Sequence, residues 1–151
     1  MVNDDDFKPL AETTAVRGFF VDNVAGDLDA TLAVANDPAG GAYPVGTVIQ
    51  FIPQEAMVKR APGFDPDSNE WEFFTLEVTA AGTKILTRGG NEVISRFSGT
   101  SCAGCHSAAE PQFDFVCEDD HGSAPLPVGD DVITAIQDAD PRPSDDRASS
   151  G

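Results

Sequence analysis

The segment from Trp71 to Val78 alternates between the two sides of an extended chain, and no other segment limits the possible folds as strongly. Phe74, Leu76 and Val78 fall on one side, and Phe73 falls on the other with more polar neighbours. A period of two residues predicts a β-strand with at least one buried face. The chain should therefore contain a sheet.

Further short strands are expected on either side of this segment. Residues Thr47 to Ile52 and Ala56 to Arg60 precede it and are rich in β-branched or apolar side chains. Lys84 to Thr87 and Glu92 to Phe97 follow it around a pair of glycines. Short connections between successive strands favour antiparallel pairing.

Two short helices are expected as well. After Asp27, a good N-cap residue, apolar side chains recur at helical spacing until Pro38 interrupts the pattern. A second helical stripe follows Asp130 and Asp131 and should end before Pro141. The predicted fold class is therefore α+β, an antiparallel sheet flanked by a few short helices.

The length of 151 residues fits one domain. We expect a flexible acidic arm over residues 1–14, a single domain over 15–137 and a disordered tail over 138–151. Phe7 and Leu10 are the residues of the arm that could dock on a neighbouring surface. The tail is rich in Pro, Asp and Ser and has no apolar anchor.

The charge of the chain excludes some classes of partner. Asp and Glu number 26 against 9 Lys and Arg, which gives a formal net charge of −17. Such a chain repels nucleic acid and anionic membrane surfaces. The acidic residues form either a solvated shell or a docking face for a basic redox protein. No run reaches the roughly 18 apolar residues of a membrane span, so we expect none.

Two thiols and an imidazole lie within five residues, Cys102 to His106. In a C-x-x-C-H motif the cysteines add to the vinyl groups of a haem and the adjacent histidine binds its iron. The composition of this chain gives roughly one chance match per thousand such sequences. The motif therefore predicts one covalent haem c, attached through Cys102 and Cys105, with His106 as axial iron ligand. A short helix should begin within the motif and carry the haem.

Two other uses of the same cysteines compete with haem attachment. Cys102, Cys105, Cys117 and His121 have a spacing that could close a tetrahedral zinc site, but this site would leave His106 without a role. A thioredoxin-like redox motif is disfavoured, because the cysteines come late and no βαβ unit surrounds them. Haem attachment remains the preferred interpretation.

The sixth iron position decides the class of haem protein. Met57 and His121 are the side chains of the usual type that could fill it, as an electron carrier requires. Met57 lies in a strand pattern, where a methionine is ordinarily a buried core residue. His121 lies in an acidic loop, where a histidine is ordinarily exposed to solvent. An open or weakly occupied position is therefore expected, with His121 kept as the alternative ligand.

Four segments in order carry a resemblance to a known family. They are Tyr43-Pro44-x-Gly46-Thr47-Val48, Trp71-Glu72-Phe73, the haem motif and Asp114-Phe115-Val116. Together they resemble the cytochrome P-460 and beta-type cytochrome c-prime family over roughly residues 43 to 117. The resemblance implies an antiparallel sheet with flanking helices, a five-coordinate haem and a homodimer.

The resemblance also implies roles for single residues. Hydroxylamine-oxidising members cross-link a lysine to the haem, but Phe51 stands at the matching place here and Lys59 lies farther along. Gas-binding members resemble this chain in presenting a phenylalanine, so Phe51 is a candidate lid and Phe73 a candidate wall. Arg60 and Glu72 are candidate distal polar groups.

Three functions follow from these expectations. The first is an exported protein that binds small diatomic ligands such as nitric oxide. The second is a periplasmic electron carrier, and the third is a haem-dependent oxidoreductase acting on hydroxylamine or another small nitrogen compound. The first six residues do not resemble a secretory signal. We nevertheless expect a periplasmic or secreted protein, because bacterial haem c is attached outside the cytoplasm.

Overall fold

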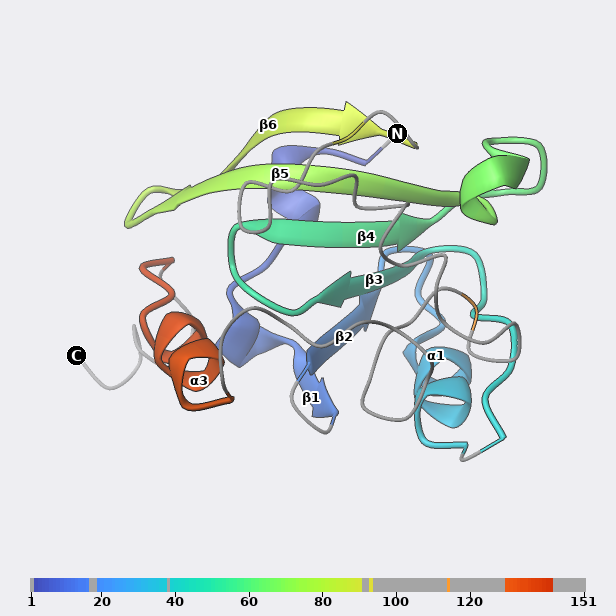
Figure 1. The fold of residues 1–151 in the computed structure, drawn as a ribbon, viewed down its shortest axis with the longest axis horizontal. Coiled ribbons are helices and arrows are strands. Elements are labelled where there is room, and N and C mark those ends of the chain that lie inside the picture. Colours follow the sequence, from blue (N-terminus) through green and yellow to red (C-terminus); the bar gives the residue numbers. More distant parts are fainter. Residues whose placement is uncertain are drawn as a thin grey trace.

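Six strands of the computed structural model form one antiparallel sheet in which each strand pairs with the next along the chain (Figure 1). The structure describes residues 2–16, 19–37, 39–90, 93, 114 and 130–142. The strands are β1 (Thr14–Val16), β2 (Phe19–Asn23), β3 (Thr47–Gln50), β4 (Glu55–Lys59), β5 (Trp71–Thr79) and β6 (Gly82–Gly89).

Among the described residues two α-helices flank the sheet, α1 (Leu28–Ala35) and α3 (Asp130–Asp138), which lie at opposite ends of its lower half in Figure 1. Short 3-10 turns are η1 (Asp4–Asp6), η2 (Leu10–Glu12) and η3 (Pro66–Ser68). The α+β prediction is confirmed. The strand expected at Glu92 to Phe97 and the helix expected at the haem motif lie outside the described residues, apart from Val93, which is not in a strand.

Helix α1 begins as the sequence predicted. The Asp27 carboxylate accepts a hydrogen bond from the Ala30 amide at 3.3 Å, which satisfies an amide of the first turn. Thr31 faces the sheet and is buried. Its hydroxyl lies 2.8 Å from the Thr47 hydroxyl and accepts from the Asn23 amide group, so hydrogen bonds link α1 to β2 and β3.

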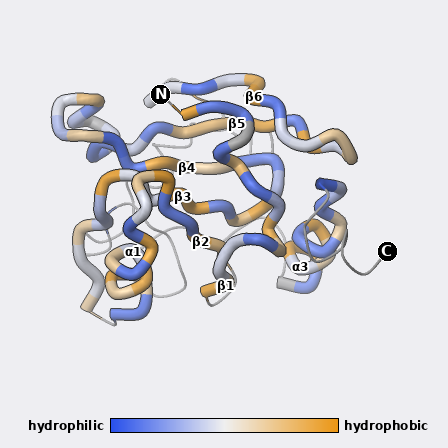
Figure 2. The backbone as a smooth tube through the Cα atoms, turned by 180° about the vertical axis from the view of Figure 1, so that it is seen from behind, coloured by the Kyte–Doolittle hydropathy of each residue, from blue (hydrophilic) through white to orange (hydrophobic). Residues whose placement is uncertain are grey.

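The centre of the sheet, from β3 to the first part of β5, is buried on both faces, and each face has its own apolar cluster. The Trp71 cluster consists of Val16, Phe19, Val21, Ala35, Tyr43, Ile49, Met57, Trp71, Phe73 and Val93. The Phe74 cluster consists of Val2, Phe7, Val48, Ala56, Val58, Phe74 and Leu76. Neighbouring residues of a strand point to opposite faces, so Phe73 and Phe74 enter different clusters. In Figure 2 the hydrophobic positions within β3 and β4 mark the centre of the sheet.

The N-terminal segment is packed, which corrects the expectation of a flexible arm. Phe7 is 2% exposed, and its ring lies 4.7 Å from that of Phe74 between centroids. Its carbonyl accepts a hydrogen bond from the Thr83 hydroxyl, and the Asp4 carboxylate accepts one from the Ile85 amide. The segment crosses the face of β4 and β5 that Figure 2 turns to the viewer. Three buried apolar side chains anchor the segment, Val2 together with Phe7 and Leu10, the two residues for which docking was considered from the sequence.

The expected tail is also wrong for residues 138–142, because Asp140 and Arg142 are 7% and 1% exposed. The Arg142 guanidinium donates to both carboxylate oxygens of Asp140 and to Gln50 of β3. Burial would raise the pKa of Asp140, but the hydrogen bonds from Arg142 and from the Leu10 amide hold that pKa below its ordinary value of 3.8. An ion pair replaces the apolar anchor that the sequence lacks. Residues 143–151 lie outside the described part of the chain.

Candidate functional site

The haem motif itself is outside the described residues, as are Cys117 and His121. The roles of Cys102, Cys105, His106 and His121 therefore stay predictions. Phe51 and Phe73, the predicted lid and wall, are described. Asp114, the first residue of the last segment used for the family resemblance, is also described.

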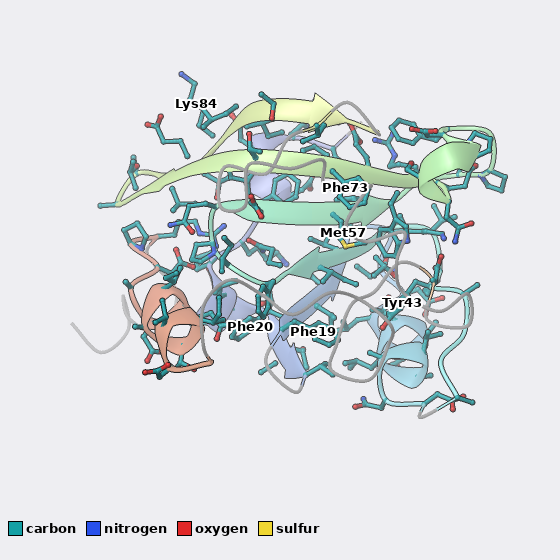
Figure 3. The ribbon with its side chains drawn as sticks, viewed as in Figure 1. Phe19, Phe20, Tyr43, Met57, Phe73 and Lys84 are labelled. Atoms are coloured by element: carbon teal, nitrogen blue, oxygen red, sulfur yellow. The ribbon has the colours of Figure 1, made fainter. Side chains whose placement is uncertain are left out.

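Phe51 and Phe73 pack into the same apolar cluster. Phe73 is part of the Trp71 cluster, and Phe51, partly buried just after β3, packs against it. Met57 lies opposite Phe73 across the β4–β5 ladder and belongs to the same cluster. Figure 3 shows Phe73 and Met57 together at the centre of the sheet. The expected burial of Met57 is confirmed, and its thioether packs in a cluster that holds the rings of Phe51 and Phe73 together with those of Phe19, Tyr43 and Trp71.

Helix α3 supports the turn that holds Phe51. The Gln137 side-chain amide donates a hydrogen bond of 2.8 Å to the Phe51 carbonyl. Phe51 follows the last residue of β3, so its carbonyl is beyond the described β3–β4 ladder. A residue near the end of the chain therefore fixes the backbone of the predicted lid, which the sequence pattern did not suggest.

Arg60 and Glu72, the candidate distal polar groups, lie on the side of the sheet opposite to Phe73, and their role stays a prediction. Glu72 is buried and accepts hydrogen bonds from Arg60 and from Arg88, the latter at 2.7 Å from Nε. Arg88 also stacks on the Phe74 ring at 4.9 Å. Because Glu72 and Phe73 are adjacent in β5, their side chains point to opposite faces, and the Glu72 carboxylate lies on the same face as Phe74.

Lys59, the lysine considered for a haem cross-link, is held in a buried ion pair. Its Nζ lies 2.8 Å from each carboxylate oxygen of Asp114, with side-chain exposures of 10% and 3%. Nζ also donates to the Asn69 carbonyl at 2.9 Å and lies 5.1 Å from the centroid of the Trp71 ring. The ammonium therefore has an anionic, a polar and an aromatic partner.

Asp114 joins three of the segments on which the resemblance rests. Its carboxylate accepts a hydrogen bond from the Tyr43 amide at 2.9 Å, and its carbonyl accepts one from the Trp71 indole at 2.8 Å. The Tyr43 and Trp71 rings meet edge to face at 5.9 Å. The backbone at Asp114 is left-handed, with a φ of 51°, which aspartate tolerates better than most residues.

Sequence reasoning missed this junction, although one signal pointed to it. Lys59 ends a strand whose other members are mostly apolar, and a lysine in such a place requires an acidic partner if it is buried. Nothing in the sequence selects Asp114 among 26 acidic residues. In the part of the chain that the structure describes, no group of three or more His, Cys, Asp or Glu side chains could hold a metal ion.

In the described ranges no helix is long and apolar enough to cross a membrane. Comparison with known proteins gave no matching family model, no matching curated protein and no matching solved structure.

Proposed function

We propose that the protein is an exported single-haem c-type cytochrome whose iron binds small diatomic ligands such as nitric oxide. The observation that carries the proposal is the sequence Cys102-Ala103-Gly104-Cys105-His106. Each of its three reactive side chains has a separate chemical role, and small residues separate the thiols. The zinc alternative would use both cysteines and give His106 nothing to do.

The donor set fits haem c. The S–H bond of each cysteine adds across one vinyl group, so that a thioether S–C bond forms and the proton goes to the neighbouring carbon without an oxidant. The imidazole of His106 would hold the iron, on the short helix that we expect to begin within the motif. The Trp71 cluster supports the proposal because an apolar sheet face is a suitable surface for a porphyrin.

The residues expected around the sixth position determine which ligands are accepted. Ferrous haem supplies an iron that binds neutral diatomic molecules. Phe51 and Phe73 offer no hydrogen bond, so they would exclude water and leave a bound anion unstabilised. Arg60 and Arg88, which donate to Glu72, lie on the opposite face of the sheet, so they cannot stabilise a bound anion. This combination favours nitric oxide or carbon monoxide over charged ligands.

An electron carrier is the second candidate, and one contact favours it. Met57 lies opposite Phe73 on the same face, where a thioether could complete the iron coordination. An oxidoreductase that acts on hydroxylamine is less favoured, because the ammonium of Lys59 is already held by Asp114. Membership of the cytochrome P-460 and beta-type cytochrome c-prime family, a homodimer and a redox protein partner remain part of the proposal.

Covalent attachment is tested by producing the chain in a host that matures c-type cytochromes. Thioether bonds survive unfolding, so denatured protein should keep its haem on a haem-stained gel. Cys102→Ala combined with Cys105→Ala should abolish the stain, while Cys117→Ala, the matched control, should keep it. Haem that leaves the intact protein in acidic organic solvent would refute the proposal.

The spectrum of the same sample separates the two candidates. A high-spin ferric haem that binds carbon monoxide on reduction supports the open position. A low-spin spectrum that Met57→Leu converts to high spin supports the electron carrier instead. Met57→Leu nearly conserves the volume of the buried side chain, so a spectral change would not come from a cavity.

A further inference from the structure

The N-terminal arm, residues 2–12, covers one face of the sheet without being part of it. Its regular structure is limited to η1 and η2. Among the described members of the Phe74 cluster, Val2 and Phe7 alone come from outside the strands. In Figures 1 and 2 the arm runs from β6 across the sheet to the side of α3. Individual side chains and single hydrogen bonds therefore hold the arm in place.

The C-terminal segment, residues 139–142, binds the middle of the arm. The Arg142 guanidinium donates a hydrogen bond of 3.2 Å to the Phe7 carbonyl. The Asp140 carboxylate accepts one of 2.9 Å from the Leu10 amide and also pairs with Arg142. Both members of this ion pair are buried. The same pair of charges therefore holds the arm through a carbonyl and through an amide.

Strands β3 and β6 complete the junction. The Gln50 side chain of β3 donates to the Lys8 carbonyl at 3.2 Å and accepts from Arg142 at 3.1 Å. The Thr83 hydroxyl of β6 donates to the Phe7 carbonyl at 2.8 Å and accepts from Arg142 at 3.0 Å. The arm, the C-terminal segment and two strands therefore share one hydrogen-bonded network with Arg142 at its centre.

Neither segment can leave this network alone without a loss of buried hydrogen bonds. If the arm moves away, the Arg142 guanidinium and the Asp140 carboxylate each lose a partner. If residues 139–142 move away, the Phe7 carbonyl and the Leu10 amide lose theirs. A buried polar group without a partner is costly. The favoured open state is therefore one in which both segments have moved, because water then satisfies the freed groups.

We propose that residues 2–12 and 139–142 form a clasp that opens as one unit while the sheet stays folded, with Arg142 as the residue that couples the two ends. Segments held by few contacts open at a lower free energy than the whole fold does. Opening uncovers the Phe74 cluster and frees the Ile85 amide of β6, which donates to the Asp4 carboxylate in the closed state. The clasp goes beyond the proposed function, since the contacts that define it lie outside the haem motif.

The test is amide hydrogen exchange, followed by NMR in the whole chain as purified. Three amides report on the clasp because each donates to one of its carboxylates, Leu10 and Arg142 to Asp140 and Ile85 to Asp4. Amides of the β3–β4 ladder report on the sheet.

One variant at each end tests the coupling. Phe7→Ala removes the ring that packs on Phe74 and keeps the backbone carbonyl, and it should speed exchange of the Arg142 amide about 100-fold. Arg142→Met should speed exchange of the Ile85 amide, at the other end of the arm, by a similar factor because it breaks a buried ion pair. The two effects should occur together, because coupling between two sites is reciprocal.

Thr31→Val is the matched control for a loss of overall stability. Thr31 is fully buried in α1, where its hydroxyl bonds Asn23 and Thr47. Helix α1 packs against the Trp71 cluster, on the face of the sheet opposite to the arm. The variant should speed exchange in the β3–β4 ladder about tenfold, since it removes buried hydrogen bonds. The three clasp amides should keep their rates, because opening of the clasp leaves α1 in place.

Two outcomes would overturn the clasp. An unchanged rate at the Arg142 amide in Phe7→Ala would mean that the two ends open separately. Clasp amides that Thr31→Val speeds as much as the ladder would mean that they exchange only when the whole fold opens. If either clasp variant does not fold, the milder Phe7→Leu or Arg142→Lys replaces it, with the same reporters and the same deciding outcomes.

Discussion

Replacing Arg142 by methionine tests whether an ion pair anchors the C-terminal segment. The Arg142 side chain donates five hydrogen bonds, two to Asp140 and one each to Gln50, the Phe7 carbonyl and Thr83. The methionine variant keeps most of the side-chain volume and loses all five. Asp140 then remains buried with only its backbone donors, the amides of Leu10 and residue 142.

The expected loss of unfolding free energy follows from the burial of the pair. Breaking a buried ion pair by removing one partner costs about 3–5 kcal/mol. The hydrogen bonds to Gln50, Phe7 and Thr83 belong to the same guanidinium and are not added separately, because such groups act as one network. For a chain of this size the cost corresponds to a melting temperature lower by about 10 °C.

The assay is equilibrium urea unfolding of wild type, Arg142→Met, Asp140→Asn and the double variant. The double variant should be more stable than the sum of the single losses implies, which gives the coupling energy of the pair. A loss below about 1 kcal/mol in Arg142→Met would refute the anchoring role, since exposed pairs contribute no more than that.

The pH dependence of the unfolding free energy provides a second test of the same ion pair. The pKa of Asp140 is lowered in the folded state from an ordinary value of 3.8. The carboxylate therefore contributes stability that is present above pH 3.8 and lost as the pH falls through the lower folded pKa. The difference between wild type and Arg142→Met should shrink in that acidic window. A constant difference from pH 6 to pH 2 would contradict the assigned ion pair.

Three further predictions concern the arm, the lid and the sixth ligand. Phe7→Ala should cost about 3–5 kcal/mol in urea unfolding, because the ring is buried against Phe74; Phe64→Ala, at a ring that is 40% exposed, is the control and should cost far less. Phe51→Ala should speed carbon monoxide binding measured by flash photolysis, about tenfold for each 1.4 kcal/mol of steric barrier removed, and an unchanged rate would exclude Phe51 as lid. His121→Ala should leave the ferric spin state unchanged, and a change from low to high spin would identify His121 as the sixth ligand.

Patterns within short segments were enough to predict most of the described fold. The alternation in β5 and the N-cap at Asp27 depend on residues within one turn or one strand of each other, so their structural meaning survives without knowledge of the rest of the chain. The two ends were predicted wrongly for a physical reason. Composition describes the average character of a segment, whereas Phe7 and Arg142 each hold their segment by specific contacts with distant strands.

The haem motif and the Lys59–Asp114 pair show the same division at the proposed site. Five consecutive residues carry the proposal of haem attachment, because thiols and imidazole have intrinsic reactivity toward a haem. The partner of Lys59 is 55 positions away, and its choice depends on how β4, β5 and the segment at residue 114 come together in space. By itself the sequence predicted four of the six described strands, their antiparallel pairing and the cofactor that we propose. Only the tertiary structure decided which charges meet and which sheet face each side chain serves, because burial and pairing arise between segments and not within them.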